Sequence, residues 1–484
     1  MFEDEDYFEE DDEELEQAIE KFESLMETND STYFDSEEFE YIIDHYVEHN
    51  QLKLARKAVN MALEQHPESN MLKIKEARQY LLESHPEKAF QLLQHVEHDD
   101  DETPDYFLVL GSCLAALGQS REALENYFNA LPYFDEDEKF DLYNAIAYEY
   151  QRLGKFDIAL EFYNKALPLS DDYLNERDTI YHEIRACYLS SGRKEEAIAY
   201  FQHLVDEDPH NSKAWTNIGD CYRMMGEYEA SIDPYEFALA IDPEDLWTNM
   251  HLADIYYDLG RYKEAIDTLE EALRNGVETS IIHTSLGDCY YRLNNLDTAK
   301  QHFTKALEIN EMNGGGWAGL GYISSDCGDS QKAIKYFEKA FELEPWETEH
   351  LYSIAADYHK LNRLDLSMKY LMMIQEMDPR DADSYFYIAD LYGEMDKVDE
   401  AINTLQYGLL QTDDAPSLLY LLAYAYFIKG MRSHGLDALD RALDADFDAY
   451  NDFLDYDRNL LANDPDIIDL IEQHKRKHET NPTE

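Results

Sequence analysis

One pattern repeats every 34 residues through most of this 484-residue chain. With Ser212 numbered position 1, apolar or small residues occupy positions 4, 7, 8, 11, 20, 24 and 27, and a proline stands at position 32. In this copy they are Trp215, Ile218, Gly219, Tyr222, Ser231, Tyr235, Ala238 and Pro243. Twelve copies begin at residues 36, 70, 104, 140, 178, 212, 246, 280, 314, 348, 382 and 416. A repeat of this length predicts an array of similar supersecondary units.

The spacing inside each copy predicts two helices. Positions 4, 7, 8 and 11 fall on one face of a first helix, and positions 20, 24 and 27 fall on one face of a second. A glycine or polar turn near position 15 separates the helices, small residues at positions 8 and 20 let them approach closely, and the proline ends the pair. One helix pair cannot bury its apolar face alone, so neighbouring pairs are expected to stack.

These copies resemble the tetratricopeptide repeat family over residues 36–449. The resemblance implies an all-α fold: a right-handed α-solenoid superhelix of about twelve helix-turn-helix repeats. It also implies that the first helices line a concave groove. The motif is specific for the fold and says little about function.

The two ends of the chain depart from the repeat. Residues 1–20 contain twelve acidic residues and no basic one, which predicts an acidic, disordered segment. Residues 21–35 are expected to form an N-terminal helix or cap. The spacing of Leu15, Ile19, Phe22 and Met26 indicates an amphipathic helix over the first repeat. Residues 450–484 are expected to form C-terminal capping helices and a tail, since a solenoid needs covered ends.

The charge of the chain favours one class of partner. Asp and Glu number 105 against 40 Lys and Arg, for a formal net charge of −65. Such a field repels phosphate backbones and anionic lipid, so we expect no nucleic acid and no membrane, and we favour a basic protein segment. The alternative is that the acidity mainly serves solubility. No apolar run approaches a membrane span and the first residues lack a secretory signal, so the expected location is cytoplasmic.

Three features look chemical and have simpler interpretations. Gly314, Gly316 and Gly319 are spaced as in a dinucleotide-binding loop, but a predicted helix precedes them where that loop needs a strand. His45 and His49 belong to an H-x-x-E-H spelling, but no third metal ligand can be singled out. Four cysteines stand at position 10, where a thiol is a small apolar filler: Cys113, Cys187, Cys221 and Cys289. The sequence therefore predicts no enzyme, no cofactor and no metal site.

The remaining functional signal lies in the predicted groove. If the family geometry holds, positions 2, 5, 6, 9, 12 and 13 of each first helix face it. The predicted partner-binding residues are Asn217, Asp220, Arg223, Asp254, Tyr257, Asp288, Tyr291, Gly315, Gly319, Tyr322, Tyr352, Phe386, Tyr387, Asp390 and Tyr420. An acidic row beside rigid aromatic anchors suits a peptide that carries Lys or Arg. The two glycines are expected to leave a shallow depression for a bulky side chain of that peptide.

Two functions fit these features. The first is a non-catalytic scaffold or adaptor that binds a protein or peptide segment, basic in character, in the concave groove. The alternative is a regulatory or assembly subunit that docks in a larger complex through its convex face or its ends. The basic stretch His474–His478 could meet the acidic N-terminus of another copy and give self-association. It could instead simply match the dipole at the end of a helix.

Overall fold

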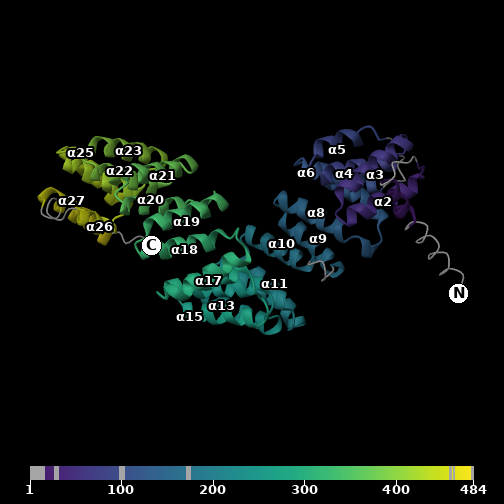
Figure 1. The fold of residues 1–484 in the computed structure, drawn as a ribbon, viewed down its shortest axis with the longest axis horizontal. Coiled ribbons are helices and arrows are strands. Elements are labelled where there is room, and N and C mark those ends of the chain that lie inside the picture. Colours follow the sequence, from purple (N-terminus) through teal and green to yellow (C-terminus); the bar gives the residue numbers. More distant parts are fainter. Residues whose placement is uncertain are drawn as a thin grey trace. The chain divides into compact units, whose positions relative to one another are not determined.

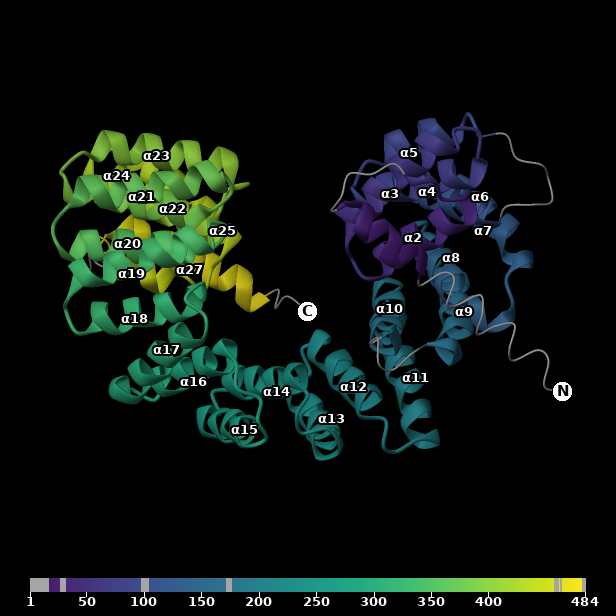
Figure 2. The same ribbon diagram turned by 45° about the vertical axis from the view of Figure 1, so that its right-hand side comes forward.

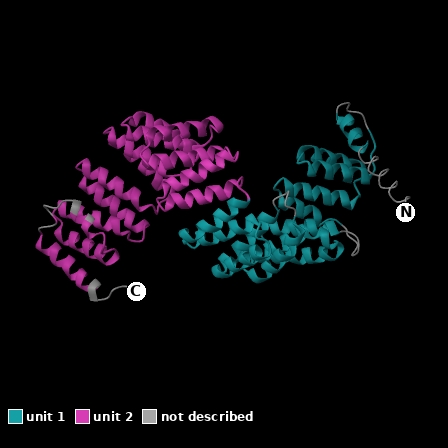
Figure 3. Cartoon of the chain, turned by 90° about the horizontal axis from the view of Figure 1, so that it is seen from below, with its two compact units in different colours: residues 1–241 teal, residues 242–484 magenta. Residues whose placement is uncertain are grey.

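The computed structural model describes residues 17–26, 32–96, 104–170, 176–456, 461 and 464–480. Within these ranges every regular element is a helix and no strand occurs, so the predicted all-α solenoid class is confirmed. The chain divides into two compact units (Figure 3), called unit 1 for Met1–Ile241 and unit 2 for Asp242–Glu484. Most of the acidic segment expected to be disordered, residues 1–16, lies outside the described residues.

Unit 1 is a succession of helix pairs, each packed on the next (Figures 1 and 2). Its pairs are α2 (Ser36–Glu48) with α3 (Leu52–Gln65), α4 (Asn70–Leu82) with α5 (Pro86–Leu93), α6 (Pro104–Ala116) with α7 (Ser120–Ala130), α8 (Phe140–Arg152) with α9 (Phe156–Ala166), α10 (Glu176–Ser190) with α11 (Lys194–Glu207), and α12 (Ser212–Met224) with α13 (Tyr228–Ile241). Three short 3-10 turns follow α7 and α9: Leu131–Tyr133, Glu136–Glu138 and Leu167–Leu169.

Unit 2 continues the same plan and adds two terminal helices. Its pairs are α14 (Leu246–Asp258) with α15 (Tyr262–Arg274), α16 (Ser280–Arg292) with α17 (Leu296–Ile309), α18 (Gly314–Asp326) with α19 (Ser330–Leu343), α20 (Glu349–Lys360) with α21 (Leu364–Met377), α22 (Ala382–Glu394) with α23 (Val398–Gln411), and α24 (Pro416–Ile428) with α25 (Arg432–Ala445). The terminal helices are α26 (Tyr450–Tyr456) and α27 (Pro465–Thr480).

The first helices begin at or near the residues that the repeat register predicts. Ten of the twelve first helices begin at the residue that opens their repeat, and the other two begin at Glu176 and Glu349, within two residues of it. Several begin where a side chain accepts a backbone N–H of the first turn, as Asn211, Thr279 and Asn313 do. Position 15 adopts positive φ in every repeat, at Asn50, Ser84, Gly118, Gly154, Gly192, Gly226, Gly260, Asn294, Gly328, Asn362, Asp396 and Gly430. A left-handed residue there ends each first helix and turns the chain into the second.

Close contact within each pair explains the small residue at position 8. A Cβ built on Gly219 would lie 2.6 Å from the ring of Tyr235, which is position 24 of the same repeat. A Cβ built on Gly287 would lie 2.5 Å from the ring of Phe303. An aromatic ring of the second helix therefore lies directly on the backbone of the first. The pair can close this tightly only where position 8 has little or no side chain.

Helices cover the apolar surface at both ends of the repeat array. Residues 17–26 are helical, and their Ala18, Phe22 and Leu25 are buried with Phe34, which precedes the first repeat, and Phe39 within it. This helix begins within the segment expected to be disordered, residues 1–20. At the other end, α26 and α27 bury their apolar side chains in the core of the last repeats, at Phe453, Ile467 and Ile471.

The glycine-rich start of α18 has a packing role. Gly314 is the first residue of the helix and α17 precedes it, so the strand that a dinucleotide-binding loop requires is absent from this described stretch. Gly319 is buried, and a Cβ there would lie 2.3 Å from the ring of Phe303 in the preceding repeat. The prediction that Gly319 forms an open depression for a partner is therefore wrong. The ring of Phe303 fills that space, held between Gly287 and Gly319.

We expect Gly319→Ala to lower stability although alanine favours helix. The added methyl must displace Phe303, a core ring that is 1% exposed, and overpacking of this kind costs about 1–3 kcal/mol. The matched control is Gly393→Ala, because Gly393 is helical and a Cβ there meets nothing within 4 Å. The control should gain up to about 1 kcal/mol from helix propensity. Urea denaturation followed by circular dichroism measures both changes, and equal gains would show that Gly319 is not tightly packed.

Candidate functional site

The structure buries four of the fifteen predicted partner-binding residues. Besides Gly319, the side chains of Asn217, Asp220 and Tyr420 are 7%, 4% and 2% exposed. The Tyr420 hydroxyl donates to the carbonyl oxygen of Asp446 at 2.6 Å, and its ring packs on Phe453. These four residues were expected on the surface of the groove, but they lie inside the protein. The repeat positions that usually face a groove are covered here by large neighbours.

Asp220 of α12 is the centre of a buried polar network in unit 1. Its carboxylate forms an ion pair with the guanidinium of Arg185 from α10, which also donates to the Asn217 side chain at 2.5 Å. The hydroxyl of Tyr235 donates to the other carboxylate oxygen at 2.7 Å, and Arg223 lies 3.6 Å from that oxygen. A carboxylate so surrounded is neutralised within the protein. Asp220 is therefore not available to a basic partner.

Asp288 of α16 differs from Asp220 although it has the same position in its repeat. It lines a cavity of about 150 Å³ in unit 2, together with Ala253, Asp254, Tyr257, Leu269, Ser285 and Cys289. No hydrogen bond or ion pair to its carboxyl is found among the described residues. Burial, and to a lesser extent the negative charge of Asp254, raise the pKa of Asp288 to about 7. This carboxyl is therefore poised to ionise when a cation approaches it.

The predicted aromatic residues of unit 2 are held in several ways. The hydroxyls of Tyr291 and Tyr352 donate to Asp326 at 2.6 Å and to Asp381 at 2.7 Å. Tyr322 packs its ring against Phe337. Tyr387 is 48% exposed and contacts the ring of Tyr352. Hydrogen bonds and ring contacts thus fix the orientation of the tyrosines, while one face of this group remains open to solvent.

A larger cavity of about 540 Å³ lies between α20 and α22. It brings together three of the predicted residues, Tyr352, Tyr387 and Asp390, and adds Glu349, Ser353, Ala355, Ala356, His359, Lys360, Ser367, Leu371, Asp383 and Leu391. The other twelve predicted residues, Phe386 and the two glycines among them, do not line it. The sequence interpretation missed Glu349 and Asp383, although both stand at position 2, which the same position rule assigns to the groove.

The electrostatics of this cavity favour a cation. The protein around Asp390 displaces water and raises the pKa of its carboxyl, and the charge of Glu394 raises it further while His359 opposes the change. The imidazole of His359 contacts Glu394 at 2.9 Å. Lys360 is held on the rim by the Ser325 hydroxyl at 2.5 Å and by Asp357 at 3.5 Å. The carboxylates of Glu349, Asp383 and Asp390 therefore outnumber this lysine on the cavity wall.

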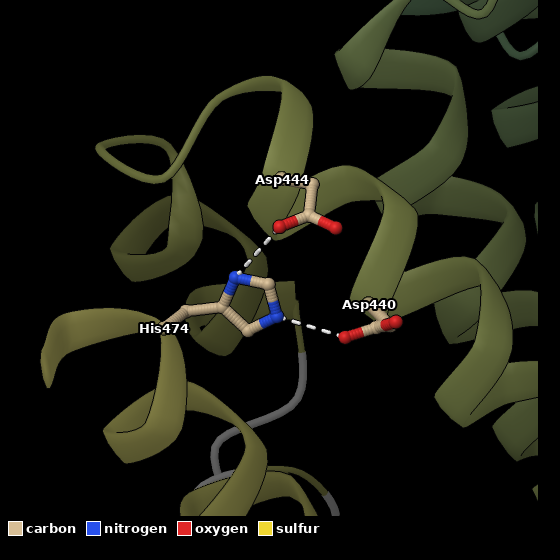
Figure 4. Close-up of side chains that lie close together, drawn as sticks. All are labelled: Asp440, Asp444 and His474. Atoms are coloured by element: carbon tan, nitrogen blue, oxygen red, sulfur yellow. Dashed lines mark hydrogen bonds and ion pairs between the residues drawn. The ribbon is translucent and has the colours of Figure 1, made fainter. Parts of the chain in front are cut away.

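A second cluster of ionisable groups fastens α27 to α25 (Figure 4). His474 is 2% exposed; its Nε2 lies 2.8 Å from Asp440 and its Nδ1 lies 3.3 Å from Asp444. The two carboxylates flank opposite edges of the imidazole, as Figure 4 shows, so each acid faces a different ring nitrogen. Each ring nitrogen of His474 thus contacts one carboxylate of α25. Part of the basic tail thus serves to dock the terminal helix within the chain.

The cysteines at position 10 are core residues, as predicted. Cys113, Cys187, Cys221 and Cys289 are buried, and burial raises the pKa of each thiol to about 12. Such thiols are protonated and unreactive at neutral pH. Over the part of the chain that the structure describes, none of the helices combines the length and apolar character needed to cross a membrane.

Family models of the tetratricopeptide repeat match five ranges of the chain. They are residues 140–173, 181–211, 212–276, 244–312 and 315–345. Each range falls on helix pairs of the 34-residue register. The chain is a tetratricopeptide repeat protein. Its predicted family is thereby confirmed, and the framework residues described above are the residues that this repeat requires.

Two curated proteins resemble parts of this tetratricopeptide repeat protein. Outer dynein arm-docking complex subunit 4 of Danio rerio is 32% identical over 146 residues, which are 28% of this chain and 30% of the relative. Photosystem I assembly protein Ycf3 of Prochlorococcus marinus is 25% identical over 95 residues, which are 20% of this chain and 54% of the relative. The matches therefore span less than two thirds of either relative.

The solved structures that resemble this chain have low sequence identity to it and low TM-scores. The APC/C hetero-tetramer Cut9-Hcn1 has 16% identity and a TM-score of 0.40, over 81% of this chain and 96% of that chain. YrrB, titled a TPR protein with an unusual peptide-binding site, has 21% identity and a TM-score of 0.30, over 38% and 95%.

The raised pKa of Asp288 gives stability a definite pH dependence. The folded carboxyl releases its proton near pH 7 and the unfolded one near 3.8, so stability falls as pH rises between these values. We expect Asp288→Asn to remove this loss. The stability of the variant relative to wild type should grow from about pH 4 to about pH 7 and then level off. Urea midpoints at several pH values measure the difference.

The control is Asp258→Asn, which removes an exposed carboxylate from α14. It matches the loss of one negative charge at an exposed position, and its effect on stability should not show the rise between about pH 4 and pH 7 expected of Asp288→Asn. A constant difference for Asp288→Asn as well would contradict the raised pKa.

Proposed function

We propose that this protein is a non-catalytic interaction scaffold that binds a basic segment of another protein on the first helices of unit 2. The observation that carries the proposal is the 540 Å³ cavity between α20 and α22, where acidic and tyrosine side chains line one space. Cavities of this volume are typical of specific binding sites. The expected groove binding and cytoplasmic location belong to this proposal.

Charge and aromatic chemistry support this choice of partner. The formal net charge of −65 attracts a basic segment over a long range and raises its association rate at low salt. At the cavity, Tyr387 offers a half-exposed ring and Asp390 a partly desolvated carboxyl. Rigid aromatic anchors beside complementary charges are the usual centres of binding energy. Cationic side chains can also rest on the faces of tyrosine rings.

A second candidate is a regulatory or assembly subunit that docks through its convex face or its ends. The names of the two relatives favour it, since one is a docking complex subunit and the other an assembly protein. Each match covers less than a third of this chain, so the first candidate remains preferred.

We expect the variant Glu349→Gln/Asp383→Asn to capture much less basic protein than wild type. Both residues line the cavity and both changes leave the shape of the side chain nearly unaltered. Full-length protein serves as bait at roughly 0.05 M and 0.3 M salt, and captured proteins are quantified by mass spectrometry. Capture should fall several-fold in the variant and also at the higher salt, because salt screens exposed charges.

The matched control is Asp365→Asn/Glu376→Gln, which removes the same charge from exposed positions of α21. It should capture as wild type does. If both variants lose capture equally, net charge and not the cavity determines binding. If neither loses capture while truncation of the terminal helices does, the protein docks through its ends and the first candidate fails.

A further inference from the structure

One structural slot recurs in the repeat array. It lies between consecutive first helices, bounded by position 8 of one repeat and position 9 of the next. In unit 1 the slot between α10 and α12 contains Arg185 at position 8 and Asp220 at position 9. Here the guanidinium of Arg185 fills the slot and binds the carboxylate of Asp220 and the amide oxygen of Asn217. We call this the filled slot.

The slot between α14 and α16 has the same carboxyl without the cation. Ala253 stands where the filled slot has Arg185, 68 residues earlier, and Asp288 stands where it has Asp220. The two other donors to Asp220 are also replaced: Tyr235 corresponds to Phe303 and Arg223 to Tyr291. Phe303 has no hydroxyl, and the Tyr291 hydroxyl donates to Asp326. We call this space, the 150 Å³ cavity lined by Ala253, Leu269 and Asp288, slot A.

The large cavity between α20 and α22 contains a third copy, slot B. A step of 102 residues, three repeats, carries all seven lining residues of slot A onto residues that line the large cavity. The pairs are Ala253 and Ala355, Asp254 and Ala356, Tyr257 and His359, Leu269 and Leu371, Ser285 and Tyr387, Asp288 and Asp390, and Cys289 and Leu391. Slot B thus again combines a small position 8 with an aspartate at position 9.

We propose that slots A and B each bind the guanidinium of an arginine side chain from the partner protein, in the manner in which Arg185 occupies the filled slot. This identification of the bound group rests on the proposed function, which supplies a basic protein segment. Two slots in one unit could hold two arginines of the same segment and so raise its affinity.

The dimensions and chemistry of the slots fit this group. A cavity of about 150 Å³ can hold a benzene-sized molecule, and the planar guanidinium is smaller. Guanidinium is weakly hydrated and forms fork-shaped hydrogen bonds, so it enters a partly buried carboxylate site more readily than an ammonium group. Burial and Asp254 hold the pKa of Asp288 near 7 when the slot is empty. A cation bound there would favour the ionised carboxylate and lower that pKa.

The test observes each slot separately. Full-length protein is labelled with ¹³C on leucine methyl groups, because Leu269 and Leu371 lie in the walls of slots A and B. The probe is Nα-acetyl-arginine N-methylamide, titrated at roughly 0.15 M salt to screen the long-range attraction of the acidic chain. The corresponding citrulline compound is the control, since it keeps the shape of the side chain and lacks its charge.

The response of each slot to the arginine probe should depend on the carboxyl of that slot alone. The arginine probe should shift the methyl signals of Leu269 and Leu371 saturably. Asp288→Asn should weaken the response of Leu269 about tenfold or more and leave Leu371 unchanged, and Asp390→Asn should do the reverse, because loss of a charge-assisted hydrogen bond costs at least about 1.5 kcal/mol. Ala253→Arg should abolish the response at Leu269 by filling slot A from within the chain. Each single variant thus serves as the control for the other slot.

Three results would overturn the inference. They are an equal response to the citrulline probe, an unchanged Leu269 response in Asp288→Asn, and an unchanged Leu371 response in Asp390→Asn. The capture experiment alters Glu349 and Asp383, which are not slot carboxyls, so the two proposals can fail independently. Saturable methyl shifts without cavity-dependent capture would retain guanidinium binding and reject the scaffold function proposed above. Capture without methyl shifts would retain the scaffold and reject the slots.

Discussion

The array depends on the close packing of the two helices within each pair. In four repeats an aromatic ring at position 24 lies directly on a glycine at position 8: Tyr127 on Gly111, Tyr235 on Gly219, Phe303 on Gly287 and Phe337 on Gly321. This packing holds the two helices of a pair close together. Because the helix pairs are similar, consecutive first helices pack in a similar way along each unit.

The same constraint determines where the chain can present chemistry. Most framework positions are occupied by apolar and small residues, so functional side chains come mainly from the remaining positions of the first helices. Slots form where two first helices meet over a small position 8. The residue at that position then decides the outcome: Arg185 fills its slot, whereas Ala253 and Ala355 leave cavities beside Asp288 and Asp390. A change at one framework position thus alters whether the aspartate at position 9 is paired within the chain.

Periodicity predicted the fold well and the site only in part. Helix starts and left-handed turns follow from spacing, because each depends on contacts within one or two turns of the chain, and the buried cysteines follow from their constant place on the packed face of the first helix. The site residues depend on what lies opposite them in the neighbouring repeat. Asp220 and Asp288 have the same register and the same residue type, and the identity of their neighbours, above all Arg185 or Ala253 in the preceding repeat, separates an internal ion pair from an open carboxyl. Gly319 was misassigned for the same reason, since Phe303 covers it from the preceding repeat.

The sequence by itself determined the repeat unit, its register, the family and the acidic charge, because these are properties of spacing and composition. The tertiary structure decided which polar residues are neutralised inside the protein, which cavities remain and how the basic tail docks through His474. The physical reason is that solvation and pairing of a charge depend on groups brought together by packing. Those groups belong to different repeats and have no fixed pattern along the chain.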